Sequence, residues 1–225
     1  MTVEQRHLFV RRTARYFILG DTNSEITDIW FACHGYGQLA SDFAKEFECI
    51  DEPGRLIIVP EALSRFYLPE GTGLHGPDAK IGATWMTRED RVVEIVDYIN
   101  YLDSLYDEIM RGIDREKVRV TVLGFSQGGA TANRWLTRGA SRADRLLMWG
   151  SLLASDADLN QAAEFFRKVE LTIVYGTRDQ FADSGMIAGY EAIMKKKGVP
   201  YNIITFDGGH RMDRDTLKRL AARTI

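Results

Sequence analysis

The sequence predicts an α/β fold, in which a mostly parallel sheet of eight strands carries helices on both faces. From Ile29 onward, short apolar runs rich in β-branched residues alternate with helical patterns. The connections between these runs are long enough for helical crossovers. The chain has 225 residues, 45% of them hydrophobic, which suits one sizeable core. We therefore expect a single domain over residues 1–225, without a separate cap domain.

The expected strands follow the chain in order. Residues 6–10 and 14–19 are adjacent and predict an antiparallel pair. Six further strands are expected over residues 29–33, 55–59, 118–123, 146–149, 171–175 and 201–206. Helices are expected from Ser41 to Pro53, over 87–111 with Thr87 and Asp90 as a capping pair, over 127–138, from Asp183 or Ser184, and from Asp213.

One long connection, residues 61–85, is Gly-rich and has no regular pattern. It carries Phe66, Tyr67, Leu68 and Trp85. Loops of this length in a compact domain are usually functional or disordered. We interpret the segment as the wall and partial lid of a substrate site, with a mobile surface excursion as the alternative. Leu152 and Phe181 follow later strands and are further candidates for substrate binding, although such residues are more often simple packing.

The pentapeptide Gly124-Phe125-Ser126-Gln127-Gly128 lies between a strand pattern and a helix pattern. In a G-x-S-x-G turn of this kind, the serine is strained and its hydroxyl is exposed at the end of the sheet. The helix that follows favours developing negative charge at its N-terminus. Ser126 is therefore the candidate nucleophile. The alternative is a serine that only caps the helix.

A serine nucleophile needs a base, and His210 is the best placed of four histidines. It follows the last expected strand, at the carboxyl end where open α/β sheets carry their sites. Asp179 follows the carboxyl end of the preceding strand and would fix the tautomer of the imidazole. Asp183 and Asp207 are competing acids. The order Ser126, Asp179, His210 is that of α/β-hydrolases.

Acyl transfer also needs donors for an oxyanion. The N–H of Gln127, directly after the nucleophile, is one candidate. The loop after the strand over 29–33 supplies the second, for which we choose the N–H of Tyr36, because Gly35 and Gly37 allow close backbone approach. We expect His34 to shape this loop and not to act as a base.

These motifs together resemble one family. Cys33-His34-Gly35-Tyr36-Gly37, Gly124-Phe125-Ser126-Gln127-Gly128-Gly129, Gly176-Thr177-Arg178-Asp179 and Gly209-His210 are similar to the phospholipase/carboxylesterase family of small α/β-hydrolases. That family includes bacterial carboxylesterases and acyl-protein thioesterases. The resemblance implies an α/β-hydrolase fold, a serine nucleophile with an Asp–His pair, and a shallow acyl groove. Residues 61–85 depart from it, so substrate preference is not carried over.

Composition excludes several other classes. The net charge is −3, and the basic run Lys195-Lys196-Lys197 suits a helix C-terminus better than a nucleic-acid patch. No apolar run approaches the roughly 20 residues that span a bilayer, and the charged N-terminus does not read as a secretory signal. Cys33 and Cys49 favour a reduced, cytoplasmic protein without excluding one disulfide. No metal or other cofactor is indicated.

The resulting hypothesis is a serine hydrolase of small to medium acyl esters or thioesters, a carboxylesterase, lysophospholipase or thioesterase that works through an acyl-enzyme. The alternative is a non-catalytic ligand-binding protein on the same fold, since a fold does not by itself establish turnover. The sequence does not fix the acyl length, the head group or the oligomeric state.

Overall fold

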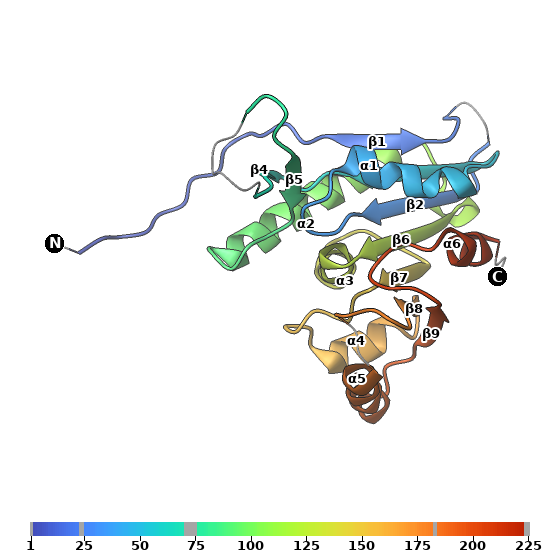
Figure 1. Ribbon diagram of the computed structural model, residues 1–225. Coiled ribbons are helices and arrows are strands. Elements are labelled where there is room, and N and C mark those ends of the chain that lie inside the picture. The colour runs from blue at the N-terminus through green and yellow to red at the C-terminus, as the bar shows by residue number, and fades with distance from the viewer. Residues whose placement is uncertain (1, 23–24, 70–75, 182–183, 223–225) are drawn as a thin grey trace.

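A computed structural model describes residues 2–22, 25–69, 76–181 and 184–222. Within them, a central sheet of seven strands has the order β1-β3-β2-β6-β7-β8-β9 (Figure 1). Its strands are β1 (Tyr16–Leu19), β2 (Asp28–Cys33), β3 (Arg55–Pro60), β6 (Arg119–Phe125), β7 (Arg145–Trp149), β8 (Glu170–Gly176) and β9 (Asn202–Phe206). Only β1 runs antiparallel to its neighbour within this sheet. The mixed but mostly parallel sheet that was expected is confirmed.

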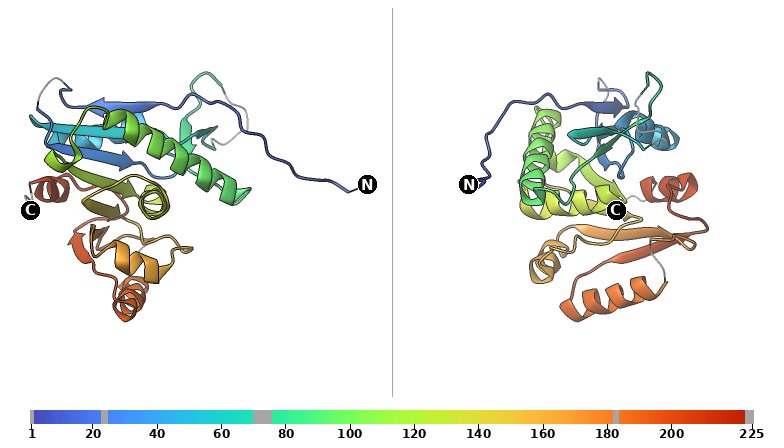
Figure 2. Two further views of the ribbon diagram at one scale, coloured as in Figure 1. Left: turned by 180° about the vertical axis from the view of Figure 1, so that it is seen from behind. Right: turned by 60° about the vertical axis from the view of Figure 1, so that its left-hand side comes forward.

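Helices cover both faces of the sheet, as Figures 1 and 2 show. One face packs against α2 (Arg91–Ile109), α3 (Gln127–Arg138), α4 (Leu159–Phe165) and α5 (Ser184–Lys197). The other packs against α1 (Ala40–Phe43), the 3₁₀ helix η1 (Ala44–Ile50) and α6 (Arg214–Ala221). A second 3₁₀ turn, η2, spans Arg115–Lys117. The central strands are continuous apolar runs because both of their faces are buried.

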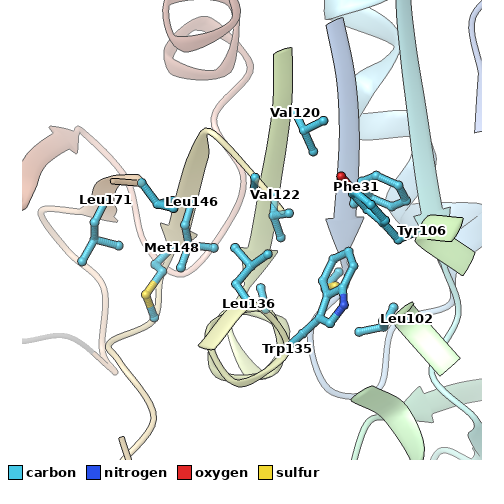
Figure 3. Packing of buried hydrophobic residues seen from close by; sticks show 14 of the residues in the cluster. Phe31, Leu102, Tyr106, Val120, Val122, Trp135, Leu136, Leu146, Met148 and Leu171 are labelled. Carbon is cyan, nitrogen blue, oxygen red and sulfur yellow. The ribbon is translucent and has the colours of Figure 1, made fainter. Parts of the chain in front are cut away.

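The core beneath α2 and α3 centres on Trp135. In Figure 3 this ring, carried by α3, lies among side chains from β2 and α2. Phe31 of β2 meets it edge-on, with 5.5 Å between ring centroids. The Nε1–H of Trp135 donates to Oδ1 of Asp103 of α2 at 2.9 Å. This packing fixes α3, and with it the turn at which the helix begins.

Residues 61–85 contain a small antiparallel pair, β4 (Ser64–Tyr67) and β5 (Ile81–Thr84), in place of a loop without strands. The pair is tied to the loop after β2, because the N–H of Gly37 donates to the carbonyl of Ala83 at 2.9 Å. The hairpin therefore lies beside the carboxyl end of the sheet, where we expected the wall of a site. Within this segment, residues 70–75, which include its one histidine, His75, lie outside the described residues.

Several predicted elements differ from the structure. Residues 6–10 form no strand, so the described sheet has seven strands and not eight, and β1 pairs with β3 instead. The apolar run Leu8-Phe9-Val10 resembles a strand, but no strand of the described residues lies beside it. The helix expected from Ser41 is one α-helical turn followed by η1, with Leu39 at its N-cap. The helix expected over 87–111 begins at Arg91. Its predicted cap Asp90 makes no side-chain capping bond.

Other boundaries match closely. α3 begins at Gln127 and ends at Arg138, as predicted. Asp213 caps α6 by accepting a hydrogen bond from the N–H of Thr216. α5 begins at Ser184, one of the two predicted starts, while Asp183 lies outside the described residues. Cys33 and Cys49 are both free thiols, and burial raises the pKa of each. In the described part of the chain, no helix is long and apolar enough to cross a membrane.

Candidate active site

Ser126 occupies a strained turn between β6 and α3. Its backbone has φ 52° and ψ −119°, a region that residues with a side chain rarely adopt. The Ser126 N–H donates to the carbonyl of Trp149 at 2.8 Å, which holds the turn against β7. The side chain makes no capping hydrogen bond to α3. A strained serine that does not cap its helix matches a nucleophile turn better than a structural cap.

Glycines on both sides of Ser126 are required by close packing of the backbone. A Cβ at Gly124 would clash with the carbonyl of Gly128. A Cβ at Gly128 would clash with the carbonyl of Cys33, at the end of β2. The turn can form only because these side chains are absent, and the second contact brings the loop after β2 against the start of α3.

His210 and Asp179 form a buried pair. Nδ1 of His210 lies 2.8 Å from Oδ2 of Asp179, whose side chain is only 1% exposed. The second carboxylate oxygen, Oδ1, accepts the N–H of Phe181 at 2.9 Å. Because a carboxylate only accepts, Nδ1 of His210 must carry the proton in this bond. Nε2 is then the nitrogen that can receive one.

The competing acids are placed differently. Asp207 pairs with Arg178 at the surface, and both side chains are well exposed. Asp183 lies outside the described residues. Of the described candidates, Asp179 is the one in contact with His210.

The imidazole of His210 lies beside the serine turn. Its ring centroid is 4.9 Å from that of Phe125, the residue before Ser126, and 4.8 Å from that of Phe181. Gly150, whose N–H donates to the carbonyl of Val174, lies directly under the ring. Among the described contacts, His210 is hydrogen-bonded to Asp179 and not to the hydroxyl of Ser126. Catalytic hydrogen bonds are often long or misaligned before substrate binds.

The loop 34–37 presents backbone donors near the same turn. Gly35 donates to Oε1 of Gln38 at 2.8 Å, and Gly37 donates to the carbonyl of Ala83. The Tyr36 N–H has no such partner among the described residues. Gln127 is the first residue of α3, where backbone N–H groups lack intrahelical acceptors. Two unused donors therefore flank the serine turn.

His34 supports this loop from within the core. Its ring is fully buried, with Nδ1 2.8 Å from the carbonyl of Gly35 and Nε2 3.0 Å from the N–H of Ala62. These partners require a neutral ring with the proton on Nδ1. Burial lowers the pKa of His34, which is opposed by the hydrogen bond to Gly35 and the charge of Glu61. A neutral imidazole whose two nitrogens are both hydrogen-bonded is suited to hold the loop and not to act as a base.

The side chain of Gln127 was not anticipated as a functional group. Its Oε1 accepts the N–H of Trp85 at 3.1 Å, and its Nε2 donates to the carbonyl of Met86 at 2.9 Å. It also exchanges hydrogen bonds with the hydroxyl of Thr84. The start of α3 is therefore fastened to the end of β5. Nothing in the sequence pattern pairs these segments, because they are more than 40 residues apart.

The predicted substrate-binding residues divide into two groups. Leu152 and Phe181 line a cavity of about 210 Å³ next to the His210–Asp179 pair. Gly150 and Ser151, in the same turn as Leu152, line it as well. Its remaining walls were missed by sequence reasoning because they come from two further segments: Ile173, Tyr175, Met186 and Ile187. A largely apolar cavity therefore adjoins the edge of the sheet that carries His210 and Asp179.

The other candidates lie around the loop 34–37. The ring of Phe66 is 5.2 Å from that of Tyr36, and Leu68 approaches Gly37. Tyr67 is exposed. Trp85 is buried, and its Nε1–H donates to the carbonyl of His34 at 2.8 Å. Its position behind the loop suits support more than substrate contact. The described residues contain no cluster of side chains that could hold a metal ion.

Solved structures with the same architecture include carboxylesterases and an acyl-protein thioesterase. A carboxylesterase from Mesorhizobium loti superposes with a TM-score of 0.67 at 15% identity, covering 93% of this chain and 95% of that one. Acyl-protein thioesterase 2 from Zea mays gives a TM-score of 0.66 at 15% identity, covering 93% and 96%. A Bacillus cereus carboxylesterase gives 0.63 at 12% identity, covering 92% of each chain. At these identities the likeness establishes the α/β-hydrolase fold.

Membership of a family rests on the sequence as a whole. Among curated proteins, none matches this chain significantly. The model of one family, described as phospholipase/carboxylesterase, matches residues 22–223 and so includes Ser126, Asp179 and His210. The chain therefore belongs to the phospholipase/carboxylesterase family of hydrolases.

Proposed function

We propose that the protein is a serine hydrolase of small to medium acyl esters or thioesters, with Ser126, His210 and Asp179 as its catalytic residues. The observation that carries this proposal is the buried hydrogen bond between Nδ1 of His210 and Asp179, set beside a strained serine turn. A binding protein has no need for an imidazole held in one tautomer. Catalysis through a serine hydroxyl needs an imidazole held in one tautomer.

The reaction proceeds in two halves. The Ser126 hydroxyl attacks the substrate carbonyl carbon while Nε2 of His210 takes its proton, and the Asp179 carboxylate stabilises the imidazolium. The backbone N–H groups of Tyr36 and Gln127 donate to the oxyanion. The tetrahedral intermediate expels the alcohol or thiol, which takes the proton from His210 and leaves an acyl-serine. Water, deprotonated by His210, then attacks the acyl carbonyl and releases the acid, restoring Ser126.

The acyl chain is assigned to the cavity lined by Leu152 and Phe181. Its walls are largely apolar, and its volume is about 210 Å³. An apolar cavity of ~150 Å³ can hold benzene, whereas drug-sized ligands need ~300 Å³ or more. A linear acyl chain of about four to eight carbons fits between these limits. The substrate is thus proposed to be a small molecule with a short to medium acyl group.

A panel of nitrophenyl esters from acetate to palmitate tests both parts. The wild type is expected to turn over butyrate to octanoate fastest. Ser126→Ala is expected to lower kcat by a factor on the order of 10⁶, because the nucleophile is lost. Ser104→Ala, which removes an exposed hydroxyl on α2, serves as the matched control and should retain full activity. Equal rates for Ser126→Ala and wild type would refute the catalytic assignment.

The non-catalytic alternative is separated by a covalent probe. An activated serine reacts with a fluorophosphonate, whereas the serine of a receptor without an aligned base does not. Labelling is expected on Ser126 in the wild type and in Ser104→Ala. An unlabelled, folded wild-type protein would favour the ligand-binding alternative.

A further inference from the structure

The N-terminal residues 2–15, here named the arm, leave apolar side chains in solvent. Leu8, Phe9 and Val10 are exposed, Phe9 by 91%. The arm and the start of α2 border a groove of about 530 Å³. Val92 and Val96 of α2 line the same groove and are themselves exposed. Contiguous exposed apolar surface of this kind marks a site of interaction.

The arm is poorly held by its own chain. Figures 1 and 2 show it leading away from the body of the molecule. It contains no strand or helix, and its side-chain contacts with the body include His7 to Asp90 at 2.7 Å and Arg15 to Glu61 at 2.6 Å. Ordering an extended segment costs conformational entropy, which buried apolar surface normally offsets. Here the residues that would supply that burial face solvent.

The patch carries both signs of charge. The arm has Arg6, Arg11, Arg12 and Arg15 against a single acid, Glu4. The facing surface of α2 contributes Glu94 and Asp97 to the groove, beside Arg12 from the arm. A patch with apolar, basic and acidic parts is complementary to another copy of itself. Two-fold dimers use this kind of self-complementary surface.

We propose that this patch is a homodimer interface, in which the arm of each protomer lies against the start of α2 in the other. An extended arm of 14 residues spans up to about 45 Å, enough to cross onto a second copy. The acidic side chains of α2 would be repelled by an anionic membrane, which makes a second protomer the better occupant. The family match begins at residue 22, so the arm is a feature of this chain outside that match.

The mass of the full-length protein in solution tests the proposal. Sedimentation velocity and light scattering between 1 and 100 µM are expected to show a dimer. Phe9→Glu and Val96→Glu should each weaken the dimer at least tenfold, because each puts a charge into the apolar centre. Ile193→Glu is the matched control, since Ile193 is an equally exposed apolar residue on α5, and it should not change the mass. A monomeric wild type, or a dimer equally insensitive to all three changes, would overturn the interface.

Charge reversal tests whether the contact is made between protomers. Arg12→Glu and Asp97→Arg should each weaken the dimer. Mixing the two variants should restore it, because each arm of the heterodimer then faces a helix of opposite charge. A mixture that stays as weak as its parents would contradict the arm-on-helix arrangement. Co-sedimentation of monomeric wild type with phosphatidylglycerol vesicles would instead assign the patch to a membrane.

Discussion

At the scale of single residues, the hydrogen bond between His210 and Asp179 determines which nitrogen of the imidazole is basic. Asp179→Asn preserves the shape of the side chain but can donate a hydrogen bond to Nδ1, which moves the proton to Nε2. We expect kcat to fall by about 10⁴ while the folded structure is kept. Asp207→Asn is the control, since Asp207 bonds to Arg178 at the surface. A small effect of Asp179→Asn, measured with the best ester of the panel, would contradict the assignment.

His34 gives a prediction for stability as a function of pH. Burial lowers the pKa of His34 in the folded protein, whereas its pKa in the unfolded chain is about 6.5. As the pH falls below that value, the unfolded state takes up a proton that the native state does not. The free energy of unfolding therefore decreases on acidification, by up to about 1.4 kcal/mol per pH unit from this residue. The stabilisation is fully present above the unfolded pKa.

The measurement compares urea unfolding of the wild type and His34→Gln between pH 5 and 8. Glutamine does not titrate. The free energy of unfolding of His34→Gln should therefore depend less steeply on pH, by the equivalent of about one proton. His7→Gln changes a histidine at the surface of the arm and is the control, because the contribution of His34 to the slope remains in it. If the free energy of unfolding had the same pH dependence in wild type and His34→Gln, folding would not change the proton binding of His34, which would contradict the prediction.

At the scale of elements, Gln127 joins α3 to the segment after β5. Gln127→Ala removes every hydrogen bond that its side chain makes to Thr84, Trp85 and Met86. Trp85 in turn holds the carbonyl of His34, so both proposed oxyanion donors lose support. A misplacement of about 1 Å can cost on the order of a hundredfold in rate.

We therefore expect Gln127→Ala to lower kcat by about ten- to a hundredfold with little change in KM. A role confined to stability would lower the melting temperature and leave kcat of the folded enzyme unchanged. Gln161→Ala on α4 is the control, because its side chain is exposed. Steady-state kinetics well below the melting temperature separate the two outcomes.

The elements that the sequence could predict are those whose pattern depends on their own burial. The bounds of α3 follow from the helical pattern after the G-x-S-x-G turn. The central strands follow from apolar runs, because both faces of the sheet are covered. Residues 6–10 have the same local pattern, yet a strand also needs a partner strand, which no local pattern supplies. The pair β4–β5 was missed because β4 alternates between half-buried and exposed residues and both short strands lie within a Gly-rich segment.

The candidate site was predictable in a similar, partial way. Ser126, Asp179 and His210 each follow the carboxyl end of a strand, so parallel topology alone predicts that they meet at one edge. The role of Gln127's side chain and the cavity walls from β8 and α5 depend on long-range packing and could be found only from the folded chain, whereas Leu152 and Phe181 were predicted.

At the scale of the whole molecule, the two ends of the sheet perform different tasks. The proposed catalytic residues lie at the carboxyl ends of the strands. At the amino ends, Arg55 and Arg145 begin β3 and β7 and face the ring of Trp30, at 5.8 Å and 5.2 Å from its centroid. Arg145 donates to the carbonyl of Leu220 and Arg55 to that of Ala221, the last residues of α6. Two guanidinium groups thus stabilise the negative, C-terminal end of the α6 dipole.

This separation predicts that stability can be changed without changing catalysis. Burial lowers the pKa of Arg145 to about 10, a further repulsive contribution coming from Arg119, so the side chain remains a cation at neutral pH. Arg145→Ala would leave the Leu220 carbonyl without its donor and open a cavity beside Trp30. We expect the free energy of unfolding to fall by about 3 kcal/mol or more.

The same variant should keep its kcat and KM at temperatures where it is folded, because no proposed catalytic group contacts residue 145. Urea unfolding and ester hydrolysis, measured on the same preparation, give the two quantities. Arg142→Ala, at an exposed arginine three residues earlier, should alter neither. If Arg145→Ala lost activity while its free energy of unfolding stayed unchanged, the two ends of the sheet would be coupled, and the active edge would depend on the position of α6.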